Sequence, residues 1–465
     1  MAVALSSTTI KHLQAIVGPA NVCLAPEELL CYAYDGTALE YPPVAVVFPG
    51  SAAEIGRIME LANQVPFSVV PRGAGTGMTG GALAVAGGVV LAMNRLNRIL
   101  EIDTANQIAV VEPGVITGQF QAEVQRLGLF YPPDPASAAF CTMGGNVAEC
   151  AGGPSAVKYG VTRDYVRGLE LVLPDGRLLA TGVRTAKGVA GYDLTRLFVG
   201  SEGTLGIITR ITVSLLAAPE ARQTFLILCA SMAQATGLVT KILSQHHPCT
   251  LEYMDTTALQ IVAHSLPEPL PAATKALLLL ELDGDQASLT AQGQALMACL
   301  AACPDLVGVR QAADPAEAQA LWAARRAISP AAFSLRPHKL SEDVVVPRTK
   351  IPELVAFTQE LGQKLGVLIF TFGHAGDGNI HVNIMLDRAK AEEVAQANRA
   401  KEQLFAKVLE LGGTLSGEHG IGITKAAYLP MELSPVAMAV TRAIKNLFDP
   451  NGVLNPGKII QAGPA

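Results

Sequence analysis

The sequence from 69 to 81 reads Val69-Val70-Pro71-Arg72-Gly73-Ala74-Gly75-Thr76-Gly77-Met78-Thr79-Gly80-Gly81 and leads from a β-branched run into a glycine-rich loop. Successive glycines leave backbone N–H groups exposed, and such groups can cradle a pyrophosphate. Counted from Gly73, a Rossmann fingerprint fails because Met78 stands where its third glycine would be, and the loop continues through Thr79-Gly80-Gly81 instead of entering a helix. A P-loop is excluded because no Gly-Lys-Ser/Thr follows. In isolation, such a loop is more often a plain turn.

Two further glycine-dense tracts weaken the plain-turn interpretation. One runs from Pro132 to Gly160, and the other runs from Phe198 to Ile207. Glycine loses more backbone freedom on folding than any other residue. Loops of this density are therefore expected where the backbone approaches a large ligand closely.

A second cluster lies further along the chain, where two short segments are rich in histidine and glycine. They read Gly373-His374-Ala375-Gly376-Asp377-Gly378-Asn379-Ile380-His381-Val382-Asn383 and Gly417-Glu418-His419-Gly420. Two histidines and a glutamate can hold a divalent cation and leave positions open for a substrate. The spacing of His374 and His381 fits one face of a helix as well as a hairpin, and the flanking glycines favour the hairpin. A single histidine is more often structural, so only the combination indicates a reaction centre.

Length and composition bound the class of protein. A chain of 465 residues is too long for one core, so two or three domains are expected. The net charge of −6, without a basic block, gives no indication of a nucleic-acid surface. The eight cysteines include no C-x-x-C pair, so we expect reduced thiols and no iron–sulfur cluster bound by this chain. No apolar stretch is long enough to span a membrane and no secretory signal is present, which predicts a cytoplasmic protein.

The pattern of elements predicts an α+β architecture. Short β-branched runs alternate with helices from 42 to 212, including helices over Ala53–Gln64 and Thr117–Arg126. An alanine-rich connector at Ala217–Ala221 marks a boundary. Beyond it, the alternation of strands and helices predicts a sheet covered by helices on one face. The segments 367–372 and 380–386 should form the hairpin around the histidines, and the tail 449–460 should be irregular.

Through these motifs, the chain resembles the FAD-binding proteins of the vanillyl-alcohol oxidase/PCMH superfamily. Over about residues 41–458 it is similar to their D-2-hydroxyacid dehydrogenase branch, which includes D-lactate dehydrogenase, D-2-hydroxyglutarate dehydrogenase and the flavoprotein subunit of glycolate dehydrogenase (glycolate oxidase). The resemblance implies a PCMH-type FAD-binding domain of two subdomains at 1–217. It further implies an α+β cap domain for substrate and metal at 218–465, of which about 445–465 returns to the flavin.

The same resemblance assigns the flavin contacts. The pyrophosphate loop matches Pro71, Arg72, Gly73, Ala74, Gly75, Thr76 and Gly77. The lining of the ribityl chain and isoalloxazine matches Pro133, Asp134, Ser137, Thr142, Gly144, Gly145, Asn146, Gly152, Gly153, Tyr159 and Gly160. The adenine and ribose contacts match Glu202, Gly203, Gly206 and Ile207, and the C-terminal return contributes Asn455. No histidine occurs in 71–81 or 137–147, so non-covalent FAD is expected.

The resemblance also assigns roles to the second cluster. It implies that His374, His381 and Glu418 bind a divalent metal, usually zinc, that His419 is the base, and that Asn383 is a substrate-site amide. In Leu321-Trp322-Ala323-Ala324-Arg325-Arg326, it implies that Arg325 clamps the substrate carboxylate. The alternative is that both arginines are solvated helix charges. Lys339 is a weaker candidate for the clamp.

The function implied is FAD- and metal-dependent oxidation of a small (D)-2-hydroxy acid to the 2-oxoacid, with hydride transfer to flavin N5. The D-2-hydroxyglutarate branch has a lysine close to the position of Ser341, so glycolate or D-lactate is favoured over a dicarboxylate. Electrons would pass to a non-NAD acceptor: an iron–sulfur or second flavoprotein subunit, a quinone or a cytochrome, reached through partners at the inner face of a membrane. The alternatives are a D-2-hydroxyglutarate dehydrogenase, a non-redox flavoenzyme of the superfamily, or a non-catalytic subunit of a larger complex.

Overall fold

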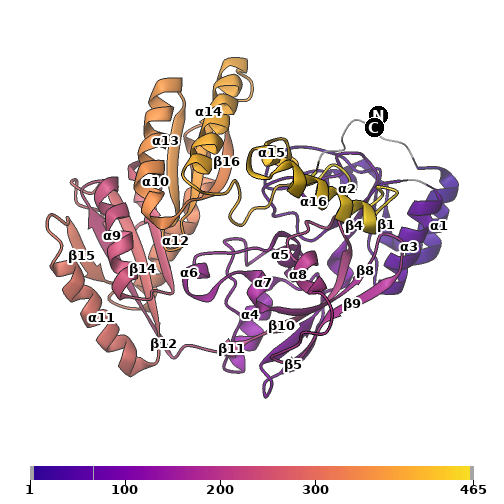
Figure 1. Cartoon of the computed structure of the whole chain (residues 1–465), viewed down its shortest axis with the longest axis horizontal. Helices are drawn as coiled ribbons and strands as arrows, with labels where there is room; N and C mark the ends of the chain where they lie inside the picture. The colour runs from indigo at the N-terminus through magenta and orange to yellow at the C-terminus, as the bar shows by residue number, and fades with distance from the viewer. Residues whose placement is uncertain (1–4, 66, 461–465) are drawn as a thin grey trace. The chain divides into compact units, whose positions relative to one another are not determined.

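The computed structural model describes residues 5–65 and 67–460, and its chain divides into two compact units (Figure 1). The first unit comprises Met1–Ala151, Val161–Ala218 and Glu418–Ala465. The second comprises Gly152–Gly160 and Pro219–Gly417. The chain therefore leaves the first unit twice, once for a short excursion, and returns to it finally at Glu418.

A four-stranded sheet, ordered β1-β2-β4-β3, begins the first unit. Its strands are β1 (Val22–Cys23), β2 (Ala45–Val47), β3 (Val69–Arg72) and β4 (Val89–Ala92), and α1 (Ser7–Val17) and α3 (Ala52–Gln64) pack against it. The three longer strands are parallel and buried on both faces, which explains their continuous apolar sequence. The Ser51 hydroxyl caps α3 by accepting a hydrogen bond from Glu54 N–H at 3.2 Å, and the predicted helix is confirmed.

A five-stranded antiparallel sheet, ordered β5-β6-β10-β8-β9, forms the other half of the first unit. Its elements are β5 (Ile99–Asp103), β6 (Ile108–Val111), β8 (Val166–Val172), β9 (Leu178–Gly182) and β10 (Ile207–Ser214), with helices α4 (Thr117–Arg126), α5 (Met143–Glu149) and α8 (Leu194–Phe198). Buried and more exposed residues alternate along β10, so one face of this sheet carries the core.

The C-terminal segment closes the first unit beside β3. After α15 (Leu429–Glu432) and α16 (Pro435–Phe448), Val69 N–H donates to Val453 O and Asn455 N–H donates to Val69 O, both at 2.8 Å. The Lys445 ammonium donates to the carbonyls of Thr204 and Leu454, each at 2.8 Å, and pairs with the Asp449 carboxylate. The tail 449–460 contains neither helix nor strand, as predicted.

The second unit is built on a seven-stranded antiparallel sheet, ordered β15-β12-β14-β13-β17-β18-β16. The strands are β12 (Ala221–Cys229), β13 (Thr250–Met254), β14 (Ala276–Gly284), β15 (Gly308–Gln311), β16 (His338–Val345), β17 (Leu368–His374) and β18 (Asn379–Leu386). The helices that pack on it are α9 (Met232–Gln245), α10 (Thr256–Val262), α11 (Gln286–Ala301), α12 (Pro315–Ala331), α13 (Ile351–Leu365) and α14 (Ala391–Glu410). The predicted histidine hairpin is confirmed as β17–β18.

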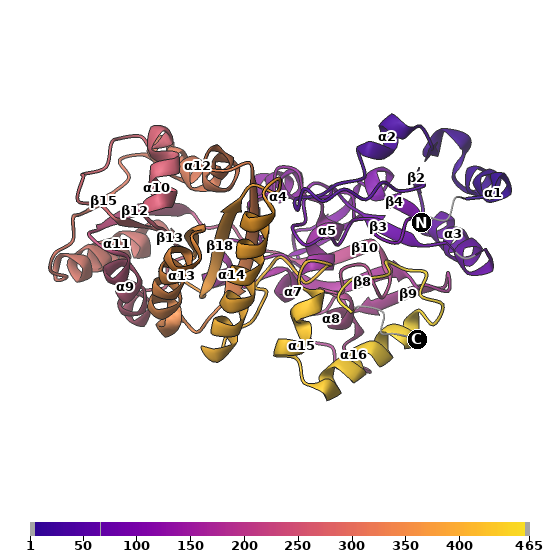
Figure 2. The ribbon, with the colours of Figure 1, turned by 90° about the horizontal axis from the view of Figure 1, so that it is seen from above.

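The prediction that helices cover one face of this sheet is wrong. Figure 2 shows α10 and α12 on one side of the strands and α9, α11, α13 and α14 on the other. The reason is visible in β14, where the side chains from Ala276 to Leu282 are buried whichever way they point. Leucines occupy both faces of this strand, so both faces must be covered, because alternation toward water would expose half of them.

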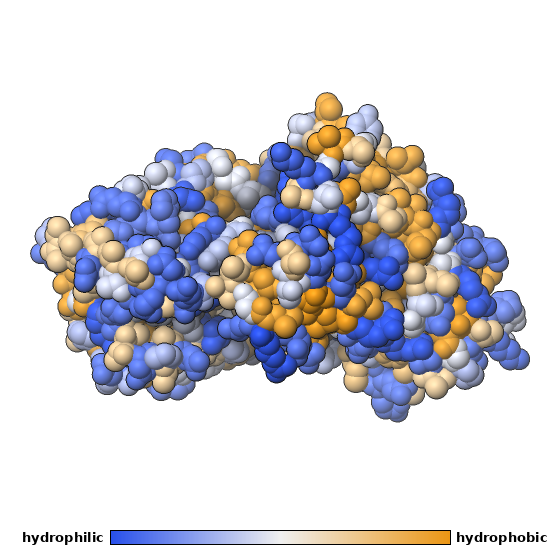
Figure 3. All heavy atoms as spheres, turned by 90° about the horizontal axis from the view of Figure 1, so that it is seen from below, coloured by the Kyte–Doolittle hydropathy of each residue, from blue (hydrophilic) through white to orange (hydrophobic). Residues whose placement is uncertain are grey.

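Hydrophilic side chains predominate on the visible face of the second unit in Figure 3 (left). Within residues 5–65 and 67–460, no helix is both long and apolar enough to cross a membrane.

We predict that Lys445→Met destabilises the protein by about 2–4 kcal/mol, because it leaves the buried Asp449 carboxylate and two carbonyls without their cation. Denaturant unfolding measures the change. Lys390→Met is the matched control, because the Lys390 side chain is exposed and pairs with Glu393, three residues away on the same helix start. The control should stay within about 0.5 kcal/mol, and equal effects of the two variants would refute the prediction.

Candidate active site and cofactor-binding residues

One face of the seven-stranded sheet carries polar side chains across four neighbouring strands. The registers place Glu252 opposite His374 and Asp343 opposite His381. Residues opposite each other, or two apart on a strand, point to the same side. Since Phe372 faces His381 and lies two residues before His374, all four polar residues share the face that α10 and α12 cover.

The two histidines of this row meet at their Nε2 atoms. His374 Nε2 lies 3.2 Å from His381 Nε2, and the ring planes are inclined at 85°. Two nitrogen ligands of one tetrahedral zinc, each at about 2.0–2.1 Å, lie roughly 3.4 Å apart. Both side chains are buried. The donor set therefore fits one divalent cation held by both Nε2 atoms.

Glu252 stands behind His374 and was missed by sequence reasoning. Its Oε1 lies 2.5 Å from His374 Nδ1, and its Oε2 accepts hydrogen bonds from Arg325 Nε at 2.9 Å and from Arg325 Nη2. Burial alone would raise the pKa of the Glu252 carboxyl, but the charges of His374 and Arg325 hold that pKa below its usual value. The one available signal was an acidic residue in the apolar strand Thr250–Met254.

Asp343 stands behind His381 and was also missed. Its Oδ1 lies 3.9 Å from His381 Nδ1 and accepts a hydrogen bond from Asn379 Nδ2 at 2.6 Å. Its Oδ2 accepts from Gly417 N–H at 2.9 Å and from the Ser416 hydroxyl at 3.2 Å. Asp343 therefore ties the end of the second unit to the histidine hairpin, immediately before Glu418 in the chain.

Asn383 and Arg325, which are expected to bind substrate, lie on the same face of the sheet as the two histidines, but each has different neighbours. Asn383 is fully buried two residues beyond His381, and its Oδ1 lies 3.4 Å from the Ser341 hydroxyl. Arg325 is buried with its guanidinium 4.5 Å from the Phe372 ring centre, whereas Arg326 is exposed. The alternative that both arginines are solvated is therefore wrong for Arg325. Its Nε and Nη2 are occupied by Glu252, and Nη1 is the remaining nitrogen.

In the first unit, the expected flavin-binding segments converge. A methyl group at Gly73 would approach the Thr142 hydroxyl oxygen to 2.3 Å, so the loop after β3 lies directly against the start of α5. Asn455 Nδ2 donates to Gly81 O at 3.0 Å and to Glu202 O at 2.8 Å. Three loops and the C-terminal return are thus brought together, with glycines where they approach most closely. This cradle fits the backbone-lined site that a dinucleotide cofactor requires.

Two of the residues expected to contact the flavin also form hydrogen bonds that stabilise the first unit. Arg72 is buried and its Nη2 donates to Tyr34 O at 2.7 Å, so it supports the loop from behind. The Glu202 carboxylate accepts hydrogen bonds from the N–H groups of Ile421 and Gly422, both at 2.7 Å. Burial raises the pKa of Glu202, and these two backbone hydrogen bonds oppose that rise. They fix the turn that follows His419.

His419 belongs to this first unit. The Thr79 hydroxyl donates to His419 O at 3.0 Å, which ties the histidine to the glycine-rich loop. Gly420 has φ of +81°, and a methyl group there would approach Glu149 Oε2 to 2.3 Å. Glu418 and His419 thus begin the return to the first unit, whereas His374, His381 and Asn383 belong to the second.

The segment Gly152–Gly160, which is expected to line the flavin, packs within the second unit. Tyr159 OH donates to Asp283 Oδ2 at 2.8 Å, and the Lys158 ammonium pairs with the same carboxylate. Burial raises the pKa of the Tyr159 phenol, and the Asp283 carboxylate raises it further. The phenol is therefore committed as a donor to β14.

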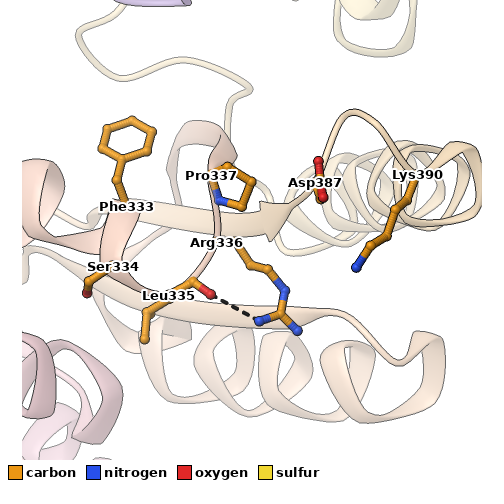
Figure 4. A pocket seen from close by; sticks show the side chains of 7 residues that line it. All are labelled: Phe333, Ser334, Leu335, Arg336, Pro337, Asp387 and Lys390. Atoms are coloured by element: carbon orange, nitrogen blue, oxygen red, sulfur yellow. Dashed lines mark hydrogen bonds between the residues drawn. The ribbon is translucent and has the colours of Figure 1, made fainter.

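A hollow of about 510 Å³ lies away from these residues (Figure 4). It is lined by Phe333, Ser334, Leu335, Arg336, Pro337, Asp387 and Lys390. These residues lie where β16 begins and β18 ends, at the opposite end of the strand pair from Asp343 and His381. None of the predicted site residues lines it.

Comparison with known proteins assigns the family. Residues 218–459 match the model of the FAD linked oxidases, C-terminal domain, and residues 43–182 match the FAD binding domain. Together with the glycine-lined cradle, these matches show that the chain belongs to the FAD-linked oxidases and is an FAD-dependent oxidoreductase.

The relatives cover nearly the whole chain. It is 42% identical to glycolate oxidase subunit GlcD of Bacillus subtilis (strain 168) over 451 residues, which are 97% of this chain and 96% of that protein. It is 36% identical to D-lactate dehydrogenase of Anaerostipes hadrus over 456 residues, 95% of each. The structure of p-cresol methylhydroxylase with substrate bound is similar, with a TM-score of 0.80 at 19% identity over 98% of this chain and 96% of that one. The expected PCMH-type α+β fold is confirmed.

We predict that Arg325→Met lowers the free energy of unfolding by about 3–5 kcal/mol, because it leaves the Glu252 carboxylate buried without its cation. Arg326→Met is the control from the same helix turn and should change stability by less than about 0.5 kcal/mol. Urea unfolding of both variants decides the matter, and a mild effect at Arg325 would show that the ion pair does not form.

Proposed function

We propose that this protein oxidises a small (D)-2-hydroxy acid to the 2-oxoacid, using non-covalent FAD and a divalent cation. The observation that carries the proposal is the histidine pair, whose Nε2 atoms lie 3.2 Å apart in a protein that also has an FAD-binding domain. A histidine pair of this kind suits coordination, and the FAD-binding domain supplies the place for a hydride acceptor.

We assign the cation to His374, His381 and Glu418, with zinc as the metal that this donor set suits best. A bound divalent cation would lower the pKa of the substrate hydroxyl, as it does for bound water. Bound FAD would supply the hydride acceptor at N5. The remaining tasks fall to side chains of the chain itself.

His419 is the proposed base for the hydroxyl proton, and imidazole is the common choice for this task. The Thr79 hydroxyl holds its backbone carbonyl, and Glu202 fixes the turn after it, so its main chain is positioned in advance. Asn383 would orient the substrate by hydrogen bonding. Arg325 would contribute its remaining Nη1 to the substrate carboxylate, with Glu252 holding the rest of the guanidinium.

Glycolate and D-lactate are the proposed substrates. The names of the two relatives support this choice, as does Ser341, close to whose position the D-2-hydroxyglutarate branch has a lysine. We propose that electrons pass to an iron–sulfur or second flavoprotein subunit, a quinone or a cytochrome. The enzyme would work in the cytoplasm, where partners bring it to the inner face of a membrane.

We predict that anaerobic mixing of the FAD-loaded protein with glycolate or D-lactate bleaches the visible flavin band. Stopped-flow absorbance follows the reaction, and D-2-hydroxyglutarate serves as the dicarboxylate comparison. Absence of bleaching with every 2-hydroxy acid would refute the proposed function.

We predict that His374→Ala retains FAD but loses at least about 100-fold in the rate of bleaching, because one cation ligand is gone. Chelation of the wild type should reproduce the loss, and added zinc should restore only the wild type. His338→Ala is the control, because His338 lies half-exposed at the other end of β16. If bleaching survives both His374→Ala and chelation, the metal assignment is wrong.

A further inference from the structure

Both carboxylate oxygens of Glu252 are engaged, each by a different element. Oε1 lies 2.5 Å from His374 Nδ1 on β17, and Oε2 accepts from Arg325 Nε and Nη2 on α12. The side chain has no exposed surface. A carboxylate with both oxygens occupied is poorly placed to bind a cation directly, so its task must lie in what it holds.

What it holds is one tautomer of His374. An ionised carboxylate only accepts hydrogen bonds, so the proton between Glu252 and His374 belongs to Nδ1. The lone pair of a neutral His374 ring then lies on Nε2, which faces His381 Nε2 at 3.2 Å.

Arg325 secures the carboxylate from the opposite side. Its guanidinium cannot lose its proton under ordinary conditions, and its two donors fix the plane of the Glu252 carboxyl group. It also lies over the Phe372 ring at 4.5 Å. Since Phe372 and His374 are on the same strand face, the ion pair and the histidine form one packed unit.

We propose that Glu252 is a positioning residue that presents Nε2 of His374 to the divalent cation, with Arg325 holding Glu252 in place. This inference rests on the metal assignment of the proposed function. It gives a task to a residue that is outside the proposed cation ligands and substrate contacts.

The competing account is that Glu252 only forms a buried ion pair with Arg325. The same sheet contains a second buried glutamate that can serve as a control. Glu281 on β14 is buried on the same face, and it accepts from Arg222 Nη1, the Thr224 hydroxyl and Trp322 Nε1, each at 2.9 Å. Trp322 precedes Arg325 by one helical turn. Glu281 thus resembles Glu252 in its burial, in having an arginine partner of its own and in bonding to α12, but its partners include no histidine.

The experiment measures zinc affinity by competition with a chromophoric chelator, using FAD-loaded wild type, Glu252→Gln and Glu281→Gln. Glu252→Gln should bind zinc about 10–100-fold more weakly, the usual effect of losing the partner of a histidine ligand. Glu281→Gln should bind within threefold of the wild type, although it loses comparable stability. Equal affinities of all three proteins, or an equal loss in both variants, would overturn the inference.

A second measurement needs no variant of Glu252. Nitrogen-15 NMR of the metal-free wild type, with His374 assigned from its loss in His374→Gln, reports which ring nitrogen carries the proton. Nδ1–H supports the inference and Nε2–H overturns it. If the wild type itself binds no zinc, the metal assignment of the proposed function fails. If the wild type binds zinc and Glu252→Gln binds it with the same affinity, only the role of Glu252 is overturned.

Discussion

The buried carboxylate of Glu252 is the constraint on which the second unit depends. An ionised group without solvent is tolerated only where charge and hydrogen bonds compensate it. Arg325 supplies the charge from α12 and His374 supplies the second partner from β17. The helix must therefore lie on this face of the sheet, and the hairpin must present its histidine here. The buried Glu252 carboxylate therefore requires a helix on this face of the sheet, in addition to the helices on the other face.

The first unit uses a related device in a different setting. Glu202 is also a buried carboxylate, but it is compensated by two backbone N–H groups instead of side-chain cations. Those groups belong to Ile421 and Gly422, so the glutamate fixes the turn that follows His419. In each unit, a buried acid thus controls the placement of a histidine: the ring of His374 directly, and the main chain at His419 through a turn. Neither acid needs to take part in the reaction itself.

Sequence reasoning reached those parts of the structure that local pattern controls. Helix α4 has the predicted bounds, and helix α3, which Ser51 caps, begins one residue before its predicted start. Strand β16 was not predicted, since Lys339, Ser341 and Asp343 fall on one of its faces and its pairing partners, β18 and Thr414, lie far away in the sequence. The glycine loops and the histidine hairpin were predicted from composition and spacing. Glu252 and Asp343 were not, because each acts on a histidine more than 35 residues away in the sequence, and a lone acid in a strand has no spacing to recognise.

The account makes one claim above the others: a cation bound through the Nε2 atoms of His374 and His381 serves an FAD-linked oxidation. The most direct measurement is an anomalous difference map at the zinc edge from crystals of the FAD-loaded, zinc-loaded protein. The account predicts one strong peak bonded to both Nε2 atoms, with His374 Nδ1 still hydrogen-bonded to Glu252. No peak between the two histidines, or a peak bonded through His374 Nδ1 with Glu252 displaced, would contradict it.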